Sequence, residues 1–170
     1  TAQFFPPGTP RLDYAEFEPG SREKVMKASA PIAPEYPGPS LSVVNDKTAD
    51  NIREITLHVA SPAKAARMEL RVVNETEVLA ASIFGKPLEP EKKNWRLHFN
   101  LFPRDGADIT LQVPAGSRVK LSARETFYGL PAIPGFSPRP DYIICTPNTV
   151  HHHGRNLESN RILVVRTSEF

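Results

Sequence analysis

The chain has 170 residues, of which 39% are hydrophobic and 24% charged, a composition typical of one globular domain. Its 21 basic and 19 acidic side chains leave a formal net charge of only +2, and no basic run is longer than Lys92-Lys93 with Arg96 nearby, which argues against binding to a nucleic-acid backbone. The single cysteine excludes an internal disulfide framework, and no apolar run reaches the roughly 18 residues that span a bilayer.

The first 40 residues are rich in proline. They hold eight of the 18 prolines. Because proline removes a backbone donor and fixes φ, we predict that residues 1–40 form an extended arm, with one short helix near residues 22–28. The arm also carries aromatic side chains, so parts of it should lie against the core. These are Phe4, Phe5, Tyr14, Phe17 and Tyr36.

From Leu41 onward, short runs alternate between apolar and polar residues with the period of half-buried strands. Strands are predicted at 55–59, 68–72, 78–84, 95–101, 109–113, 119–123 and 162–166. The runs at 109–113 and 119–123 are predicted to pair as a hairpin, and Gly85-Lys86-Pro87 is predicted to be a turn. Trp95 shares the parity of its apolar neighbours and should lie in the core. About eight strands with hardly any helical periodicity indicate an all-β domain over residues 41–170, an antiparallel β-sandwich.

Residues 127–147 interrupt the strand pattern. Five prolines and two glycines forbid a regular element there, although the segment is rich in apolar side chains. A long apolar loop must pack on its own domain or on a partner, and we expect it to be ordered and to cover an open edge or end of the sandwich. If it binds a ligand or partner instead, four side chains are the candidates. They are Tyr128, Leu130, Phe136 and Arg139.

One histidine cluster, His151-His152-His153, has metal-ligand chemistry. Consecutive residues on an extended chain point in different directions, and no cysteine or Asp/Glu pair completes a ligand set, so a solvated loop is favoured and no cofactor is expected in this chain. His58 and His98 occupy the polar parity of strands and are predicted to be surface residues. No nucleophile elbow, zinc-peptidase helix motif or phosphate-binding glycine loop occurs, so we expect no catalysis.

Five short segments of the sequence are distinctive when they are taken together. They are Leu57-His58-Val59-Ala60-Ser61-Pro62, Phe84-Gly85-Lys86-Pro87, Phe127-Tyr128-Gly129-Leu130-Pro131, Gly135-Phe136-Ser137-Pro138-Arg139-Pro140 and Arg161-Ile162-Leu163-Val164-Val165-Arg166-Thr167. Over residues 41–170 the chain thereby resembles the C-terminal extracytoplasmic region of bacterial membrane-anchored M28-family zinc peptidases. The Tyr-Gly-Leu-Pro segment followed by Pro-Arg-Pro is the most specific part of this resemblance.

The resemblance implies a zinc-dependent aminopeptidase-like domain and membrane spans upstream of a β-rich domain. The zinc site of that family has a His-x-Asp pair and an adjacent Glu-Glu, and neither occurs here, so no catalytic or zinc-binding residue is carried over. The chain begins with threonine rather than methionine, and we expect it to be a processed or excised part of a longer protein.

The resemblance therefore predicts a non-catalytic accessory domain on the periplasmic or extracytoplasmic side of a bacterial membrane. Its partners would be the upstream peptidase and membrane-spanning regions of the same polypeptide, together with peptide substrate. Zinc would belong to the upstream domain. The accessory domain would hold substrate peptides near the active site or stabilise the assembly. The alternative is a free-standing β-sandwich module that binds a carbohydrate or a peptide through the loop at 127–147.

Overall fold

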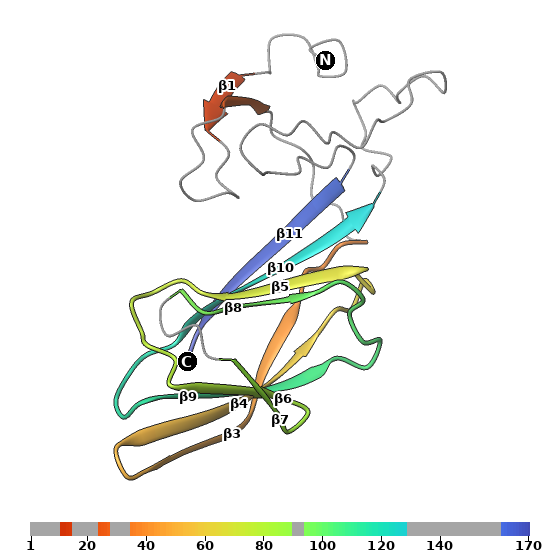
Figure 1. Cartoon of the computed structure of the whole chain (residues 1–170). Coiled ribbons are helices and arrows are strands. Elements are labelled where there is room, and N and C mark those ends of the chain that lie inside the picture. The colour runs from red at the N-terminus through yellow and green to blue at the C-terminus, as the bar shows by residue number, and fades with distance from the viewer. Residues whose placement is uncertain (1–10, 15–23, 28–34, 90–93, 129–160) are drawn as a thin grey trace. The chain divides into compact units, whose positions relative to one another are not determined.

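The computed structural model describes residues 11–14, 24–27, 35–89, 94–128 and 161–170, and within these ranges every regular element is a strand (Figure 1). The predicted all-β class is confirmed. In the same ranges there is no helix with the length and apolar character needed to cross a membrane. The chain divides into two compact units, Thr1–Pro34 with Leu130–Asn160, and Glu35–Gly129 with Arg161–Phe170.

The described part of the first unit is one antiparallel strand pair. Strand β1 (Arg11–Tyr14) pairs with β2 (Lys24–Lys27), and Leu12 lies opposite Met26. The short helix predicted near residues 22–28 is therefore wrong. A seven-residue segment gains little from helix formation because nucleation is unfavourable, whereas pairing with β1 gives its backbone groups partners at once.

Nine strands form the second unit, in two antiparallel sheets that make the predicted β-sandwich (Figure 1). The five-stranded sheet has the order β3 (Ser40–Ala49), β4 (Ile52–Ala60), β9 (Ala107–Pro114), β6 (Ala80–Ile83), β7 (Lys86–Leu88). The four-stranded sheet has the order β11 (Arg161–Glu169), β10 (Lys120–Tyr128), β5 (Arg67–Val72), β8 (Arg96–Phe99).

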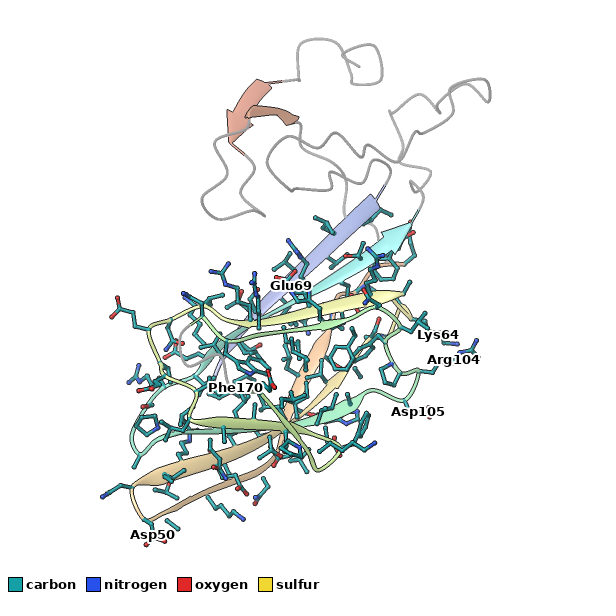
Figure 2. The ribbon with its side chains drawn as sticks, in the orientation of Figure 1. Asp50, Lys64, Glu69, Arg104, Asp105 and Phe170 are labelled. Atoms are coloured by element: carbon teal, nitrogen blue, oxygen red, sulfur yellow. The ribbon has the colours of Figure 1, made fainter. Side chains whose placement is uncertain are left out.

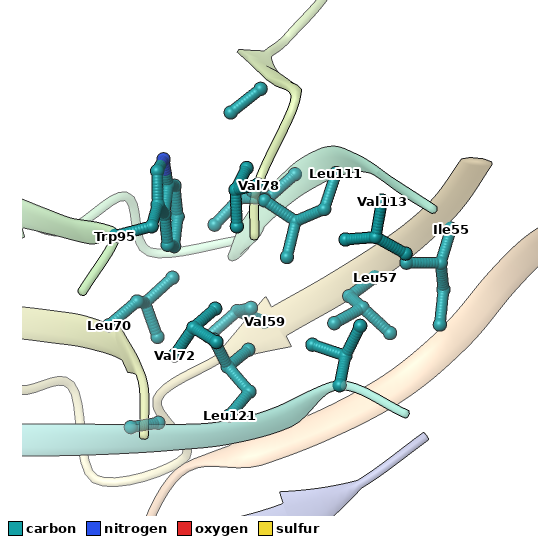
Figure 3. Packing of buried hydrophobic residues seen from close by; sticks show 14 of the residues in the cluster. Ile55, Leu57, Val59, Leu70, Val72, Val78, Trp95, Leu111, Val113 and Leu121 are labelled. Carbon is teal, nitrogen blue, oxygen red and sulfur yellow. The ribbon is translucent and has the colours of Figure 1, made fainter. Parts of the chain in front are cut away.

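The core lies between the sheets and takes one parity of residues from each long strand. In β4 these are Ile55, Leu57 and Val59, which are completely buried. Figure 3 shows side chains of β4 and β9 facing those of β5 and β10. Trp95, just before β8, is 2% exposed, which confirms its predicted place in the core. Each large apolar side chain buried in this way stabilises the fold by about 1.5–3 kcal/mol.

Two tight turns set the registers of the five-stranded sheet. Asp50 and Asn51 join β3 to β4 with φ of 50° and 62°, and Phe84 and Gly85 join β6 to β7 with φ of 48° and 73°. Two consecutive left-handed residues form the hairpin turn that matches strand twist. Lys86 and Pro87 therefore belong to β7 and not to the turn predicted from the sequence. An edge strand such as β7 accommodates a proline because one side of it makes no ladder.

The predicted hairpin of 109–113 with 119–123 is wrong, because β9 and β10 belong to different sheets. Strand β9 pairs with β4 and β6, whereas β10 pairs with β5 and β11. After the crossing, the buried Val119 exchanges backbone hydrogen bonds with Phe170 at 3.0 and 2.9 Å. An alternating run has the same pattern whether its neighbour in sequence lies beside it or across the core, so periodicity does not separate the two arrangements.

Strands β10 and β11 are antiparallel neighbours along their whole length. Their register runs from Lys120 opposite Glu169 to Tyr128 opposite Arg161. At this end of β10 the half-buried Phe127 meets Tyr36 edge-on, with ring centroids 4.8 Å apart. Tyr36 is one of the aromatic residues of the predicted arm, and its ring contacts strand β10.

Candidate functional site

A pocket opens at one end of the sandwich, between the turn after β4 and the loop after β8. The two segments are joined by a backbone hydrogen bond of 3.3 Å from the amide of Phe102 to the carbonyl of Ala66. The pocket has a volume of about 300 Å³. Its lining residues are Lys64, Ala65, Ala66, Leu101, Phe102, Pro103 and Arg104. Figure 2 shows Lys64 and Arg104 near each other at this end of the unit.

The turn at 61–66 forms one wall and holds Lys64 in an unusual conformation. The Ser61 hydroxyl accepts a 2.7 Å hydrogen bond from the amide of Ala65, and the Ser61 carbonyl accepts one of 2.9 Å from the amide of Lys64. Lys64 has φ of +56°, in the left-handed region that long side chains rarely adopt. The hydrogen bonds on either side of Lys64 fix this backbone, so the wall is preformed.

The loop at 101–106 forms the other wall and is anchored at both of its ends. The ring of Phe102 lies edge-on against Phe99, with centroids 5.0 Å apart, and packs on the core. Gly106 donates to the carbonyl of Pro103 at 3.2 Å and has φ of +85°. Leu101, just before Phe102, is 87% exposed, the highest value among the exposed large apolar side chains of the described residues.

The charge of the pocket is positive. Of its lining side chains, Lys64 and Arg104 are cationic, and the others are apolar. Within the described residues neither cation makes an ion pair, and the exposed Asp105 is the next residue along the chain. Apolar walls with a few charged groups are typical of sites that bind small ligands or chain ends.

A buried carboxyl group lies on the inner side of the same end of the sandwich. Glu125 of β10 occupies the core parity, opposite Met68 of β5 and Val164 of β11, and is 0% exposed. Neither of its carboxylate oxygens has a hydrogen-bond partner. Burial raises the pKa of Glu125, and the nearby Ser61 hydroxyl and Arg166 guanidinium offset part of that rise. Glu125 therefore keeps its proton to a higher pH than a solvated glutamate.

Glu125 was not among the predicted site residues, although the sequence carries a signal for it. It follows Leu121 and Ala123 at the same parity of one strand. An acidic residue at a core position of an otherwise apolar face is a recognisable exception. The pocket itself has no such signal, because it forms from two loops 40 residues apart in the chain.

Most of the predicted site residues lie outside the described residues. This applies to Leu130, Phe136, Arg139, His151, His152 and His153. Tyr128 is the last residue of β10, where its backbone pairs with that of Arg161. The roles proposed for these residues therefore stay predictions.

The two strand histidines are on the outer faces of the sheets, as predicted. His58 Nδ1 is 2.7 Å from Asp108 Oδ1 on the neighbouring strand, and His98 Nδ1 is 3.8 Å from Glu69 Oε2. In the part of the chain that the structure describes, no three His, Cys, Asp or Glu side chains gather closely enough to hold a metal ion.

The outer face of the four-stranded sheet gathers positive charge that is scattered along the sequence. Its cationic side chains are Arg67, Arg71, Arg96, Lys120 and Arg124, and its acidic ones are Glu69 and Glu169. Glu69 pairs with Arg124, and Glu169 is 3.3 Å from Arg118. The sequence shows no basic stripe because strand alternation separates these residues by one position each, yet the sheet brings them onto one face.

Comparison with protein-family models, with curated proteins and with solved structures gives no match for this chain.

Proposed function

We propose that this chain is a non-catalytic accessory domain of a membrane-anchored, M28-like zinc peptidase on the extracytoplasmic side of a bacterial membrane, and that it binds the peptide substrate. The observation that carries the binding role is the pocket between the 61–66 turn and the 101–106 loop. Its side chains are apolar or cationic, and no hydroxyl, thiol, imidazole or carboxylate side chain is among the lining residues. Such a lining suits binding better than bond cleavage.

The resemblance supports the link to a peptidase. One of its segments, Leu57 to Pro62, comprises the end of β4 and the start of the turn that forms the pocket wall. Another, Arg161 to Thr167, lies in β11, which pairs with β10. The zinc and the catalytic groups would belong to the upstream domain. Carbohydrate binding is less well supported, because the one tryptophan, Trp95, is in the core and not available for stacking.

The test uses the whole purified chain in two assays. The first measures hydrolysis of aminoacyl chromogenic substrates with and without added Zn²⁺, and we expect no turnover. The second titrates the chain into fluorescein-labelled short peptides and follows anisotropy, and we expect saturable binding. Zinc-dependent turnover that persists after replacement of His151, His152 and His153 by alanine would contradict the non-catalytic role. Absence of binding to any peptide would contradict the substrate-binding role.

A further inference from the structure

We infer that the pocket binds the C-terminal carboxylate of a peptide whose last side chain is apolar. This inference rests on the proposed function and names the part of the substrate that the domain holds. Three observations support it: the two cations, the conformation of Lys64, and the apolar wall of the small pocket.

The first argument is charge complementarity. Lys64 and Arg104 come from two different loops and border the same 300 Å³ space. A carboxylate placed between them accepts a paired set of hydrogen bonds from the planar guanidinium and a further one from the ammonium group.

The second argument is the conformation of Lys64. Its φ of +56° suits glycine or asparagine, and the hydrogen bonds of the turn involve its backbone and not its side chain. The turn alone therefore gives no reason for a lysine at this position. Strained non-glycine residues are concentrated at binding and catalytic sites, where surrounding structure holds them in place. The Lys64 ammonium group makes no ion pair within the described residues, so it is available to a ligand in the pocket.

The third argument is the apolar wall. Leu101 is 87% exposed although its neighbour Phe102 packs on the core. A space of 300 Å³ is at the lower limit of ligand pockets, so it accommodates about one residue and not a long chain. An apolar terminal side chain lying on Leu101 and Phe102 removes that surface from water.

The choice of the C-terminal end follows from the reaction class of the proposed parent. An aminopeptidase acts on the free amino end of its substrate. A domain that holds the substrate without blocking the reaction must bind elsewhere on the peptide. The carboxyl terminus is the one negative group that every unmodified peptide has, and two cations recognise it without regard to sequence.

The experiment compares two N-terminally fluorescein-labelled tetrapeptides that end in leucine, one with a free carboxylate and one with a carboxamide. Anisotropy is measured with the whole chain at low ionic strength. We expect the amide to bind at least about tenfold more weakly, which corresponds to about 1.4 kcal/mol. Lys64→Gln and Arg104→Gln should each lower affinity for the free acid by a similar factor and leave the amide unchanged.

One control and one specificity variant accompany these substitutions. Lys120→Gln removes one positive charge from the outer face of β10, outside the pocket lining, and should leave the affinity for the acid unchanged. Leu101→Ser should reduce the preference for a peptide ending in leucine over one ending in glycine. Thermal melts of all variants report folding, and all three Gln replacements affect exposed side chains, so the fold should persist.

The outcomes separate this inference from the proposed function. Equal binding of acid and amide would overturn the carboxylate site while leaving a peptide-binding domain. Tighter binding of decanoate or inorganic phosphate than of the peptide acid would assign the pocket to another anion and would also overturn the inference. Zinc-dependent peptide hydrolysis by the chain would instead contradict the proposed function, whatever the pocket binds.

Discussion

Replacing Glu125 by methionine should make the folded chain more stable. The carboxyl group lies at a core position of β10 and is 0% exposed, and neither oxygen has a partner in hydrogen-bond geometry, so the nearby Ser61 hydroxyl and Arg166 guanidinium offset only part of the cost of burial. A buried polar group without a partner costs about 1–3 kcal/mol. Methionine retains a flexible side chain of similar length, so it recovers that cost without a large cavity. The free energy of unfolding should rise by about 1–3 kcal/mol, and each kcal/mol raises the melting temperature by about 2–4 °C.

The effect should depend on pH in a defined direction. The pKa of Glu125 is raised from its ordinary value of 4.5 in the folded chain, so the folded state binds more protons than the unfolded state above pH 4.5. The stability of the native chain therefore falls as pH rises from about 4.5 to the folded pKa, and above that pKa this group lowers the stability by a constant amount. Glu125→Gln lacks the titration, so its advantage over the native chain should grow across the same interval.

The assay is urea unfolding of the native chain and of the Met and Gln variants at pH 4 and pH 8. Comparing the three proteins at each pH cancels the contributions of all other titrating groups. A Met variant that is less stable than the native chain at both pH values would refute the reasoning, because it would mean that the carboxyl group makes a favourable contact in the fold.

Three further substitutions test other parts of the sandwich. Arg53→Ala removes two hydrogen bonds to the Asp46 carboxylate, at 2.6 and 2.9 Å, and one of 2.8 Å to the carbonyl of Ser117. Urea unfolding should show a loss of about 1–3 kcal/mol in the free energy of unfolding. Gly106→Ala places a Cβ 2.5 Å from a backbone oxygen and should lower the melting temperature far more than Gly116→Ala, which has a similar φ but open space. Arg71→Glu replaces a like charge directly opposite Arg96 by an opposite one and should stabilise the sheet by about 0.2–1 kcal/mol, as measured by urea unfolding.

The sandwich was predictable because strand alternation reports burial directly. Ile55, Leu57 and Val59 are apolar in the sequence and buried in the fold for the same reason, and Trp95 follows its neighbours into the core. Strand β3 was not predicted as a separate element. It is an edge strand with mostly exposed side chains, so hydrophobic burial leaves almost no pattern in it.

Pairing between strands was less predictable than the strands themselves. The connection from β9 to β10 resembles a hairpin loop in composition, but β10 pairs with β5 and β11 in the other sheet. Just before β10, backbone hydrogen bonds join Val119 to Phe170. Those bonds join residues 51 positions apart, and a single sequence holds no signal for them. The pocket could not be predicted for the same reason, because Lys64 and Arg104 border one space only after the sheets assemble.

The turn after β4 lines the pocket through Lys64 and places Ser61 near the buried carboxyl group of Glu125. Neither the left-handed backbone of Lys64 nor the buried carboxyl group is favoured by the fold alone. Lys64 occupies a backbone conformation that costs an L-residue about 1–2 kcal/mol, and glycine at this position would avoid that cost while losing about 0.5–1 kcal/mol of backbone entropy. Lys64→Gly should therefore leave the chain as stable as before or up to about 1.5 kcal/mol more stable in urea unfolding.

If Lys64 serves the ligand and not the fold, the same substitution must weaken binding of the free-acid peptide at least about tenfold, a change of about 1.4 kcal/mol. Local departures from the best structural choice are expected at functional sites, where stability is exchanged for activity. A Lys64→Gly chain that loses stability and keeps its affinity would show that the lysine belongs to the architecture of the turn. Gained or equal stability together with lost affinity would instead mean that the lysine is there to bind the peptide carboxylate.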